Sequence, residues 1–191
     1  MDPKQLMKEH ISKTARLSDD EFNDFFDCFT TKSFKKGAYI ITAGDRIDGE
    51  YFVVSGCIKT FYINDNQKMF VMQFAMPGCW ASDYSALYSG TRATINIGCI
   101  TDTELLCLSN KDRENACKKS HLIEHYFRTR MTNEYVASQK RLLSTMNNDV
   151  KYRYEELNTL FPELYNMVPK RLIAAYLGVS RETLYRLNNS R

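Results

Sequence analysis

The stretch from Lys35 to Ile63, "KKGAYIITAGDRIDGEYFVVSGCIKTFYI", consists of short apolar runs separated by turns. The runs are rich in β-branched and aromatic residues, and the turns between them hold Gly37, Gly44 and Gly56. Runs of roughly four to eight such residues, bounded by glycine-containing turns, are typical of antiparallel strands. This stretch therefore predicts the centre of a compact β-roll or barrel.

The same pattern continues downstream. Further runs of strand character are Met69–Phe74, Thr94–Ile100 and Thr103–Ser109, and seven of the eight glycines lie within residues 37–98. We predict an α+β fold whose N-terminal part, residues 1–118, is an antiparallel, jelly-roll-like β-roll with flanking helices; the family resemblance described below implies that this part is a sensor domain.

Directly before the predicted roll, residues 18–29 have the features of a capped helix. Ser18 can act as the N-cap, and Glu21 completes a capping box with it. The apolar face would be formed by four aromatic residues, Phe22, Phe25, Phe26 and Phe29. The segment therefore predicts an amphipathic helix.

The longest predicted helix covers residues 121–146, within a linking segment that we place at residues 119–147. Two apolar stripes run along it. The first consists of Leu122, Tyr126, Val136 and Leu143, and the second of Ile123, Phe127, Met131, Tyr135, Leu142 and Met146. We expect the first stripe to contact a second copy of the chain and the second stripe to pack on the roll. Burial of both within one chain remains the alternative.

The last part of the chain, residues 148–191, predicts a helix-turn-helix domain. A helix is expected around Val150–Leu160, and Pro169 suits the first turn of the next one. That helix would end at Gly178, a residue type favoured at left-handed C-caps, and Ser180 would be the N-cap of the final helix. Two helices joined by such a tight turn form the helix-turn-helix unit.

The final helix has two different faces. At about 100° per residue, Arg181, Glu182, Tyr185 and Arg186 share one face, which is free for a ligand. Arginine can bridge O6 and N7 of guanine, and glutamate can accept from N4 of cytosine. Ser180 and Thr183 suit phosphate contacts. The apolar contacts that hold the unit together would join Leu184 and Leu187 to Leu172, Ala175 and Val179.

The charge distribution indicates a polyanionic partner. Residues 1–150 carry 19 basic and 19 acidic side chains, whereas residues 151–191 carry 7 basic and 4 acidic ones, the whole of the net charge of +3. No apolar run approaches the roughly 20 residues of a membrane-spanning helix, and residues 1–10 lack a signal-peptide core. The six cysteines form no C-x-x-C pair, which fits reduced thiols in a cytoplasmic protein.

Enzymatic and metal-binding functions find little support. A cupin-type metalloenzyme needs several histidines lining its barrel, but His10, His121 and His125 lie outside the predicted strands. His121 and His125 share a helical face beside Glu124, a pattern more typical of a solvated face than of a metal site. We therefore predict no catalytic residues, no metal and no enzyme.

The segments quoted above resemble the Crp/Fnr family of bacterial transcription regulators. "IAAYLGVSRETLYRL" is similar to the family's helix-turn-helix, and residues 35–63 to its cyclic-nucleotide-binding roll, in collinear order over about residues 15–190. The resemblance implies a homodimer, an effector pocket in each roll, binding to a palindromic promoter site and contact with RNA polymerase. It assigns base reading to Arg181, Glu182 and Arg186, and a phosphate contact to Thr183.

The resemblance also places the effector pocket at "WASDYSALYSGTRATIN", where the sequence departs from members that bind cyclic AMP. Ser82 stands where the family has glycine, and Asp83 stands where it has glutamate. Arg92 matches the family's arginine, but the next residue is Ala93, where the family has serine or threonine. Thr94 would point to the opposite face of a strand. We expect no cyclic nucleotide here; a scaffold roll, a roll for another small molecule, and an interaction module without specific DNA binding remain open.

A second departure concerns the DNA-binding end. Many members carry a β-hairpin wing, for which residues 161–177 leave no room, so the chain resembles a short, wingless branch. Fewer phosphate contacts should give a weaker salt dependence of DNA binding.

Overall fold

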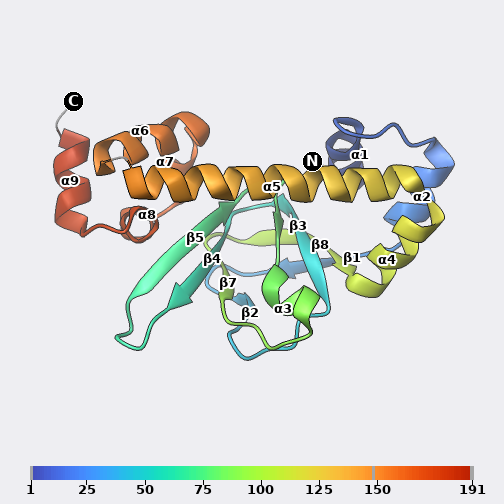
Figure 1. Ribbon diagram of the computed structural model, residues 1–191, viewed down its shortest axis with the longest axis horizontal. Coiled ribbons are helices and arrows are strands. Elements are labelled where there is room, and N and C mark those ends of the chain that lie inside the picture. Colours follow the sequence, from blue (N-terminus) through green and yellow to red (C-terminus); the bar gives the residue numbers. More distant parts are fainter. Residues whose placement is uncertain (1, 148, 190–191) are drawn as a thin grey trace.

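The computed structural model describes residues 2–147 and 149–189. The outer limits predicted for the domains, residues 1 and 191, and the start of the last domain at residue 148 lie outside these ranges. Figure 1 shows one long helix lying across a β-roll, with small helices gathered at both of its ends. This arrangement is an α+β fold, as predicted.

The roll consists of two four-stranded sheets in which all pairs are antiparallel. In order across the first sheet, the strands are β1 (Phe29–Phe34), β8 (Thr103–Ser109), β3 (Gly49–Ser55) and β6 (Trp80–Ala81). In the second they are β2 (Tyr39–Ile41), β7 (Asn96–Cys99), β4 (Ile58–Ile63) and β5 (Met69–Ala75). The strands predicted from the apolar runs are confirmed, whereas β1 and β6 lie outside those runs.

The interior between the two sheets is apolar. Alternate residues from both sheets point into it, among them Val53, Ile58, Ile97 and Leu105, each completely buried. Gly56 follows β3 with φ +87°, and a Cβ atom there would collide with the backbone of Asp102 and Thr103. Only glycine combines this left-handed conformation with such a close approach, which explains the turn between β3 and β4.

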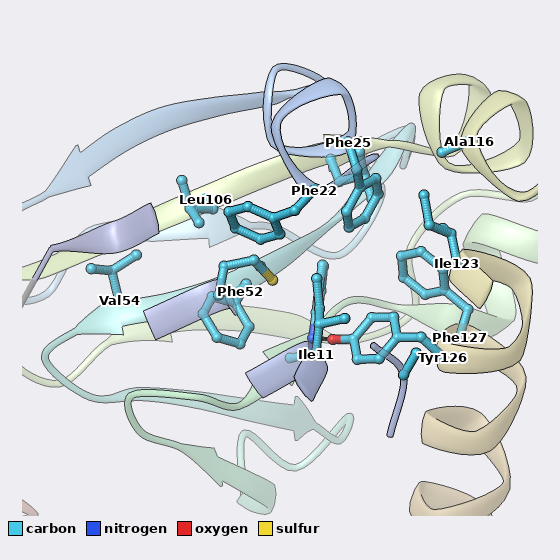
Figure 2. Packing of buried hydrophobic residues seen from close by; sticks show 14 residues of the cluster. Ile11, Phe22, Phe25, Phe52, Val54, Leu106, Ala116, Ile123, Tyr126 and Phe127 are labelled. Carbon is cyan, nitrogen blue, oxygen red and sulfur yellow. Dashed lines mark hydrogen bonds between the residues drawn. The ribbon is translucent and has the colours of Figure 1, made fainter. Parts of the chain in front are cut away.

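One end of the roll is covered by α1 (Pro3–Ser12), α2 (Asp19–Phe26), α4 (Asn110–Lys119) and the beginning of α5. Figure 2 shows how Phe22, Phe25 and Phe127 meet Phe52 of the sheet in one apolar cluster. The predicted capping box of α2 is present, but the helix ends at Phe26. Phe29 is therefore not part of its apolar face and instead begins β1.

The long helix α5 covers His121–Asn147 and carries a group of short helices at its far end. These are α6 (Val150–Leu160), α7 (Leu164–Met167), α8 (Lys170–Leu177) and α9 (Arg181–Asn189). Pro169 precedes α8 as its N-cap instead of forming its first turn. Where a wing would lie, residues 161–169 contain α7, and no strand follows β8 in the described part of the chain.

These terminal helices pack on the roll of their own chain. Phe61 of β4 and Val71 and Phe74 of β5 share one buried cluster with Leu172 and Ile173 of α8. A smaller helix, α3 (Tyr84–Ser89), connects β6 to β7 on the other side of the roll. Two regions that could act on ligands are thus in place: the surface of α8 and α9, and the loop around α3.

Candidate functional site

The turn between α8 and α9 has the geometry of a helix-turn-helix. Gly178 ends α8 with φ +73°, a left-handed conformation that costs glycine little. The Ser180 hydroxyl then accepts a hydrogen bond from the backbone N–H of Thr183 at 3.2 Å, so that it caps α9. Its hydroxyl also lies 3.2 Å from that of Thr183, so both residues predicted to contact phosphate first serve to begin the helix.

The inner face of α9 is apolar and buried. Leu184 is 3% exposed and belongs to the same cluster as Leu172, while Leu187, Ala175 and Val179 pack against that cluster while partly buried. Truncating such a leucine typically costs about 2–5 kcal/mol. The two helices are therefore held at a fixed angle by their apolar side chains.

The outer face of α9 presents the polar residues predicted for it. A shallow groove is lined by Arg181, Glu182, Tyr185 and Arg186, and Tyr185 is 64% exposed. Lys170, which we did not predict for this surface, lines the same groove from the start of α8. A cation in the first turn of a helix interacts unfavourably with the helix dipole. The position of Lys170 directly after Pro169 could therefore have indicated, from the sequence, that this residue binds a ligand.

The groove has an excess of positive charge. Its lining includes three cationic residues, Lys170, Arg181 and Arg186, and one carboxylate, Glu182, besides Leu184 and Tyr185. A hydrogen bond from Ser180, together with the backbone N–H at the helix start and the neighbouring arginines, holds the pKa of Glu182 below its ordinary value. The groove thus combines cations for phosphates with an anionic acceptor for a base donor.

The loop around α3 uses its polar residues internally. The Ser82 hydroxyl donates to the carbonyl of Gly49 at 2.8 Å. Asp83 is 2% exposed; one carboxylate oxygen accepts from the backbone N–H of Ala86 at 3.0 Å, and the other from that of Thr94 at 2.8 Å. The carboxylate predicted for the effector pocket therefore caps α3 and ties it to the following loop.

The remaining residues of the predicted pocket, Arg92, Ala93 and Thr94, are consecutive, but their side chains have different surroundings. Arg92 is exposed and donates to the carbonyl of Gly44 at 2.8 Å. Ala93 is buried within the roll, whereas Thr94 is exposed, so the two side chains lie on opposite sides of the chain. The loop keeps an exposed arginine, but its single carboxylate is already engaged by the backbone.

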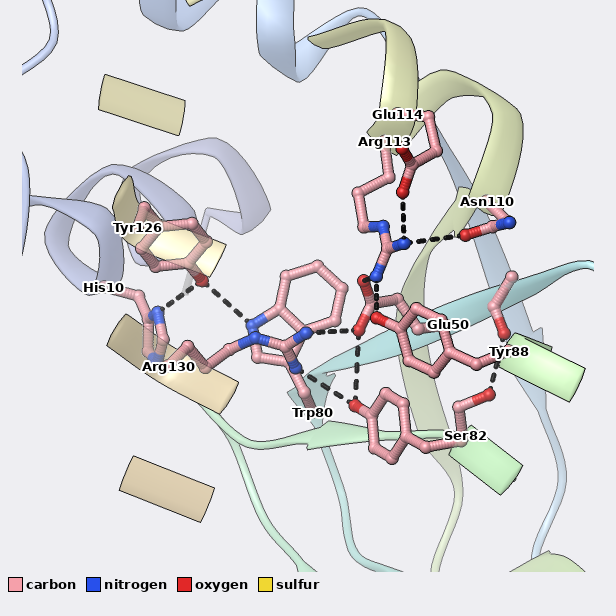
Figure 3. A network of polar contacts seen from close by, with 12 residues as sticks. His10, Glu50, Trp80, Ser82, Tyr88, Asn110, Arg113, Glu114, Tyr126 and Arg130 are labelled. Atoms are coloured by element: carbon pink, nitrogen blue, oxygen red, sulfur yellow. Dashed lines mark hydrogen bonds and ion pairs between the residues drawn. The ribbon is translucent and has the colours of Figure 1, made fainter. Parts of the chain in front are cut away.

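A buried polar network behind α3 was not predicted from the sequence (Figure 3). Glu50 of β3 is 1% exposed, and its carboxylate accepts a hydrogen bond from Arg130 of α5 at 2.5 Å. Arg130 also donates to the Tyr84 hydroxyl at 3.0 Å and lies over the ring of Trp80 at 4.7 Å. Burial lowers the pKa of Arg130, but Tyr84 and Glu50 outweigh this effect and leave it above its ordinary value.

Arg113 of α4 extends this network toward the surface. It lies 3.9 Å from Glu50, donates to Asn110 and Glu114 at 2.8 and 2.6 Å, and donates to the hydroxyl of Tyr88 in α3. The network therefore joins α3, α4 and α5 to the roll through side chains that are far apart in the sequence.

The residues predicted for a dimer contact fall into two groups. Val136 and Leu143 are exposed, at 41% and 57%, whereas Leu122 is partly buried in the first core cluster. The prediction for Tyr126 is wrong, because its ring is 1% exposed and enclosed within its own chain. Its hydroxyl accepts from the indole N–H of Trp80 at 3.0 Å.

The Tyr126 hydroxyl also lies within hydrogen-bond distance of His10, 2.9 Å from its Nδ1. Burial, together with Lys13 and Arg130 nearby, lowers the pKa of His10 to about 4, so the imidazole is neutral at neutral pH. The second apolar stripe of α5 is also divided between buried and exposed residues. Tyr135, Leu142 and Met146, which we expected to pack on the roll, are at least 55% exposed.

The described residues include no group of three or more histidine, cysteine or carboxylate side chains placed to hold a metal ion. His10 lies in α1, and His121 and His125 in α5, all outside the strands. Among the described helices, none has the length and apolar character needed to cross a bilayer.

Comparison with known proteins identifies the roll. Residues 31–120 match the family model of the cyclic nucleotide-binding domain. No curated protein matches the chain by sequence.

Solved structures of bacterial regulators share the fold of nearly the whole chain. FixK2 from Bradyrhizobium japonicum has a TM-score of 0.71 at 19% identity, over 85% of this chain and 83% of its own. The c-di-GMP-responsive regulator CLP from Xanthomonas campestris has a TM-score of 0.70 at 14% identity, over 91% of both chains. A Crp/Fnr regulator from Eubacterium rectale has 0.67 at 18% identity, over 90% of this chain and 82% of its own.

Proposed function

Because residues 31–120 match the family model of the cyclic nucleotide-binding domain and the chain shares the fold of solved Crp/Fnr regulators, we propose that the protein is a sequence-specific DNA-binding transcription regulator. It acts in the cytoplasm as a homodimer that reads a palindromic site and contacts RNA polymerase. The observation that carries the proposal is the outer face of α9, where the exposed Arg181, Tyr185 and Arg186 surround a cationic groove.

The shape of this surface suits the major groove of DNA. Leu184 is buried on one face of α9, whereas Arg181, Glu182 and Tyr185 on the opposite face are exposed. Ser180 and Thr183 lie at the N-terminus of α9, where a phosphate is favoured. In this proposal Arg181, Glu182 and Arg186 contact base edges, and Lys170 adds a phosphate contact from α8.

Selection from random duplexes tests the proposal. We expect an enriched palindrome whose half-sites lie roughly one helical turn apart. Replacing Arg181 or Arg186 by alanine should cost about 1–3 kcal/mol at matched sites and relax the base preference. Lys151→Ala removes the same charge from an exposed position of α6 outside the groove, and should change affinity much less. Failure to enrich any sequence would remove the proposal.

The homodimer is supported by the exposed apolar side chains of α5. Tyr135, Val136, Leu142, Leu143 and Met146 are 41–70% exposed in the single chain. Such a row of large apolar residues on one helix is costly in water and typical of an interface. Leu143→Asp should shift the protein to monomers in analytical ultracentrifugation, while Tyr39→Asp, at a 51% exposed position of β2, should leave the dimer intact.

The roll is proposed as a scaffold or as the receptor for a small molecule other than a cyclic nucleotide. The support is the state of Asp83, whose two carboxylate oxygens are already bound by backbone N–H groups. A cyclic nucleotide needs a free carboxylate for its ribose and an arginine for its phosphate, and of the predicted pocket residues Arg92 is exposed whereas Asp83 is buried. Micromolar binding of cyclic AMP or cyclic GMP in calorimetry would contradict this part of the proposal.

A further inference from the structure

A second arginine of the long helix lies where three elements meet. Nη2 of Arg141 donates to the carbonyl of Val71 in β5 at 3.1 Å. The centre of its guanidinium lies 3.8 Å from the centroid of the Tyr176 ring, in the last turn of α8. That ring in turn stacks on Phe74 of β5, with centroids 5.3 Å apart and planes at 30°. Arg141 therefore touches α8 and β5 at the same time.

The backbone of β5 explains why a donor is useful at this point. β5 is the last strand of its sheet, so one side of its backbone has no neighbouring strand in the described part of the roll. An unpaired carbonyl beside an apolar cluster is costly, and Arg141 satisfies the one at Val71. Burial lowers the pKa of Arg141, but an arginine remains charged at any physiological pH.

Tyr176 passes this contact on to the DNA-binding surface. It stands two residues before Gly178, at which α8 ends and the turn to α9 begins. A second hydrogen bond acts at the same place, because Nη1 of Arg153 in α6 donates to the carbonyl of Leu177 at 3.1 Å. The end of α8 is thus held from two sides, and the direction of α9 follows from it.

We propose that Arg141 is a positioning residue for DNA binding: by clamping Tyr176 of α8 onto β5 it holds the recognition helix in one orientation, without touching DNA itself. The proposal rests on the proposed function and adds to it a coupling between the roll and the helix-turn-helix. It distinguishes Arg141 from the arginines of α9, which would act on bases or phosphates directly.

Amide hydrogen exchange without DNA tests the clamp itself. Arg141→Met keeps the aliphatic stem but loses the stacked cation and its donors, and should raise exchange about tenfold in α8 while β3 and β8 keep their protection. Tyr176→Phe keeps the ring on Phe74 and under Arg141, and should resemble the wild type. Lys140→Ala removes one charge from an exposed neighbour and is the matched control. Unchanged exchange in α8 of Arg141→Met would overturn the proposal.

DNA affinity tests the consequence, at a temperature where all variants are fully folded. If α9 is held correctly in only about a tenth of the molecules, Arg141→Met should bind the selected duplex about tenfold more weakly. Its base preference and salt slope should equal those of the wild type, because no base or phosphate contact is lost. An affinity equal to that of Lys140→Ala would refute the positioning role.

The two measurements separate the possible failures. If the wild-type protein selects no duplex, the proposed function fails, and with it the effect of Arg141 on DNA binding. The exchange measurement then still decides whether Arg141 holds α8 on β5. A relaxed base preference in Arg141→Met would instead identify Arg141 as a direct contact and contradict the proposal.

Discussion

The two halves of α5 have similar compositions and opposite surroundings. In the first half Ile123, Tyr126, Phe127 and Arg130 are at most 7% exposed, enclosed by the roll and its covering helices. In the second half every residue from 132 to 140 is exposed, and Met146 is 70% exposed. The first half of α5 therefore belongs to the core of this chain, whereas the second half carries the exposed apolar side chains that we propose as the dimer surface.

The arginines of the two halves differ in the same way. Arg130 is 6% exposed at its side chain and pairs with a carboxylate that is buried as deeply. Arg141 contacts a backbone carbonyl and a ring, so its removal leaves no charge behind. Loss of the Arg130 contact would disrupt the core, whereas the Arg141 contacts can break at a smaller cost in free energy. Contacts of this weaker kind are expected between two regions that move relative to each other.

The largest expected effect comes from breaking the enclosed half. Arg130→Met would remove the closest ion-pair partner of the buried Glu50, leaving it with Arg113 at 3.9 Å and the Tyr84 hydroxyl at 3.2 Å, and should lower the free energy of unfolding by about 3–5 kcal/mol. Arg128→Met is the matched control two residues away, since Arg128 is 61% exposed and pairs with Glu124, a surface contact worth about 0–1 kcal/mol. Urea unfolding measures both; equal losses would mean that the buried pair is not special.

Lowering the pH should also destabilise the region around the first half of α5, but by less than Arg130→Met does. His10 is neutral in the folded protein with a pKa of about 4, whereas an unfolded histidine titrates near about 6.5. Between these values the unfolded chain binds more protons, so the stabilisation is complete above about pH 6.5 and is lost as the pH falls to about 4. The loss should be on the order of 2 kcal/mol, allowing for the partial exposure of His10.

Comparing unfolding curves of the wild type and His10→Gln between pH 4 and 7 measures this effect. Glutamine can still accept a hydrogen bond from Tyr126 but cannot take up a proton in this range. The difference between the two proteins should therefore shrink as the pH falls. A difference that stays constant would show that His10 does not titrate out of its site.

The smallest effect is expected at the far end of α5, in the turn of the helix-turn-helix. Gly178 has φ +73° and open space around its Cα, so Gly178→Ala meets no collision and only the strain of the left-handed conformation, about 1 kcal/mol. Gly178→Asn should cost less, because asparagine tolerates this conformation better. Thermal unfolding of the two variants measures these losses of stability. Equal losses for alanine and asparagine would show that the left-handed conformation of residue 178 is not the cause.

The sequence by itself determined the local structure of this protein. The strands around the glycine turns, the capping box of Ser18 and Glu21, the helix Val150–Leu160 and the left-handed Gly178 all follow from residues close together in the chain. Their physical causes act over a few residues: alternation, capping and backbone strain. The division of α9 into an apolar and a polar face has the same origin.

Only the tertiary structure decided which surfaces are used. A periodic pattern on α5 cannot tell that Tyr126 is enclosed by His10, 116 residues away, while Leu143 stays exposed. The pairing of Arg130 with Glu50 joins residues 80 apart, and that of Arg141 with Val71 joins residues 70 apart. Such contacts depend on how the roll closes and where α5 crosses it, because burial is a property of the packed chain and not of any segment.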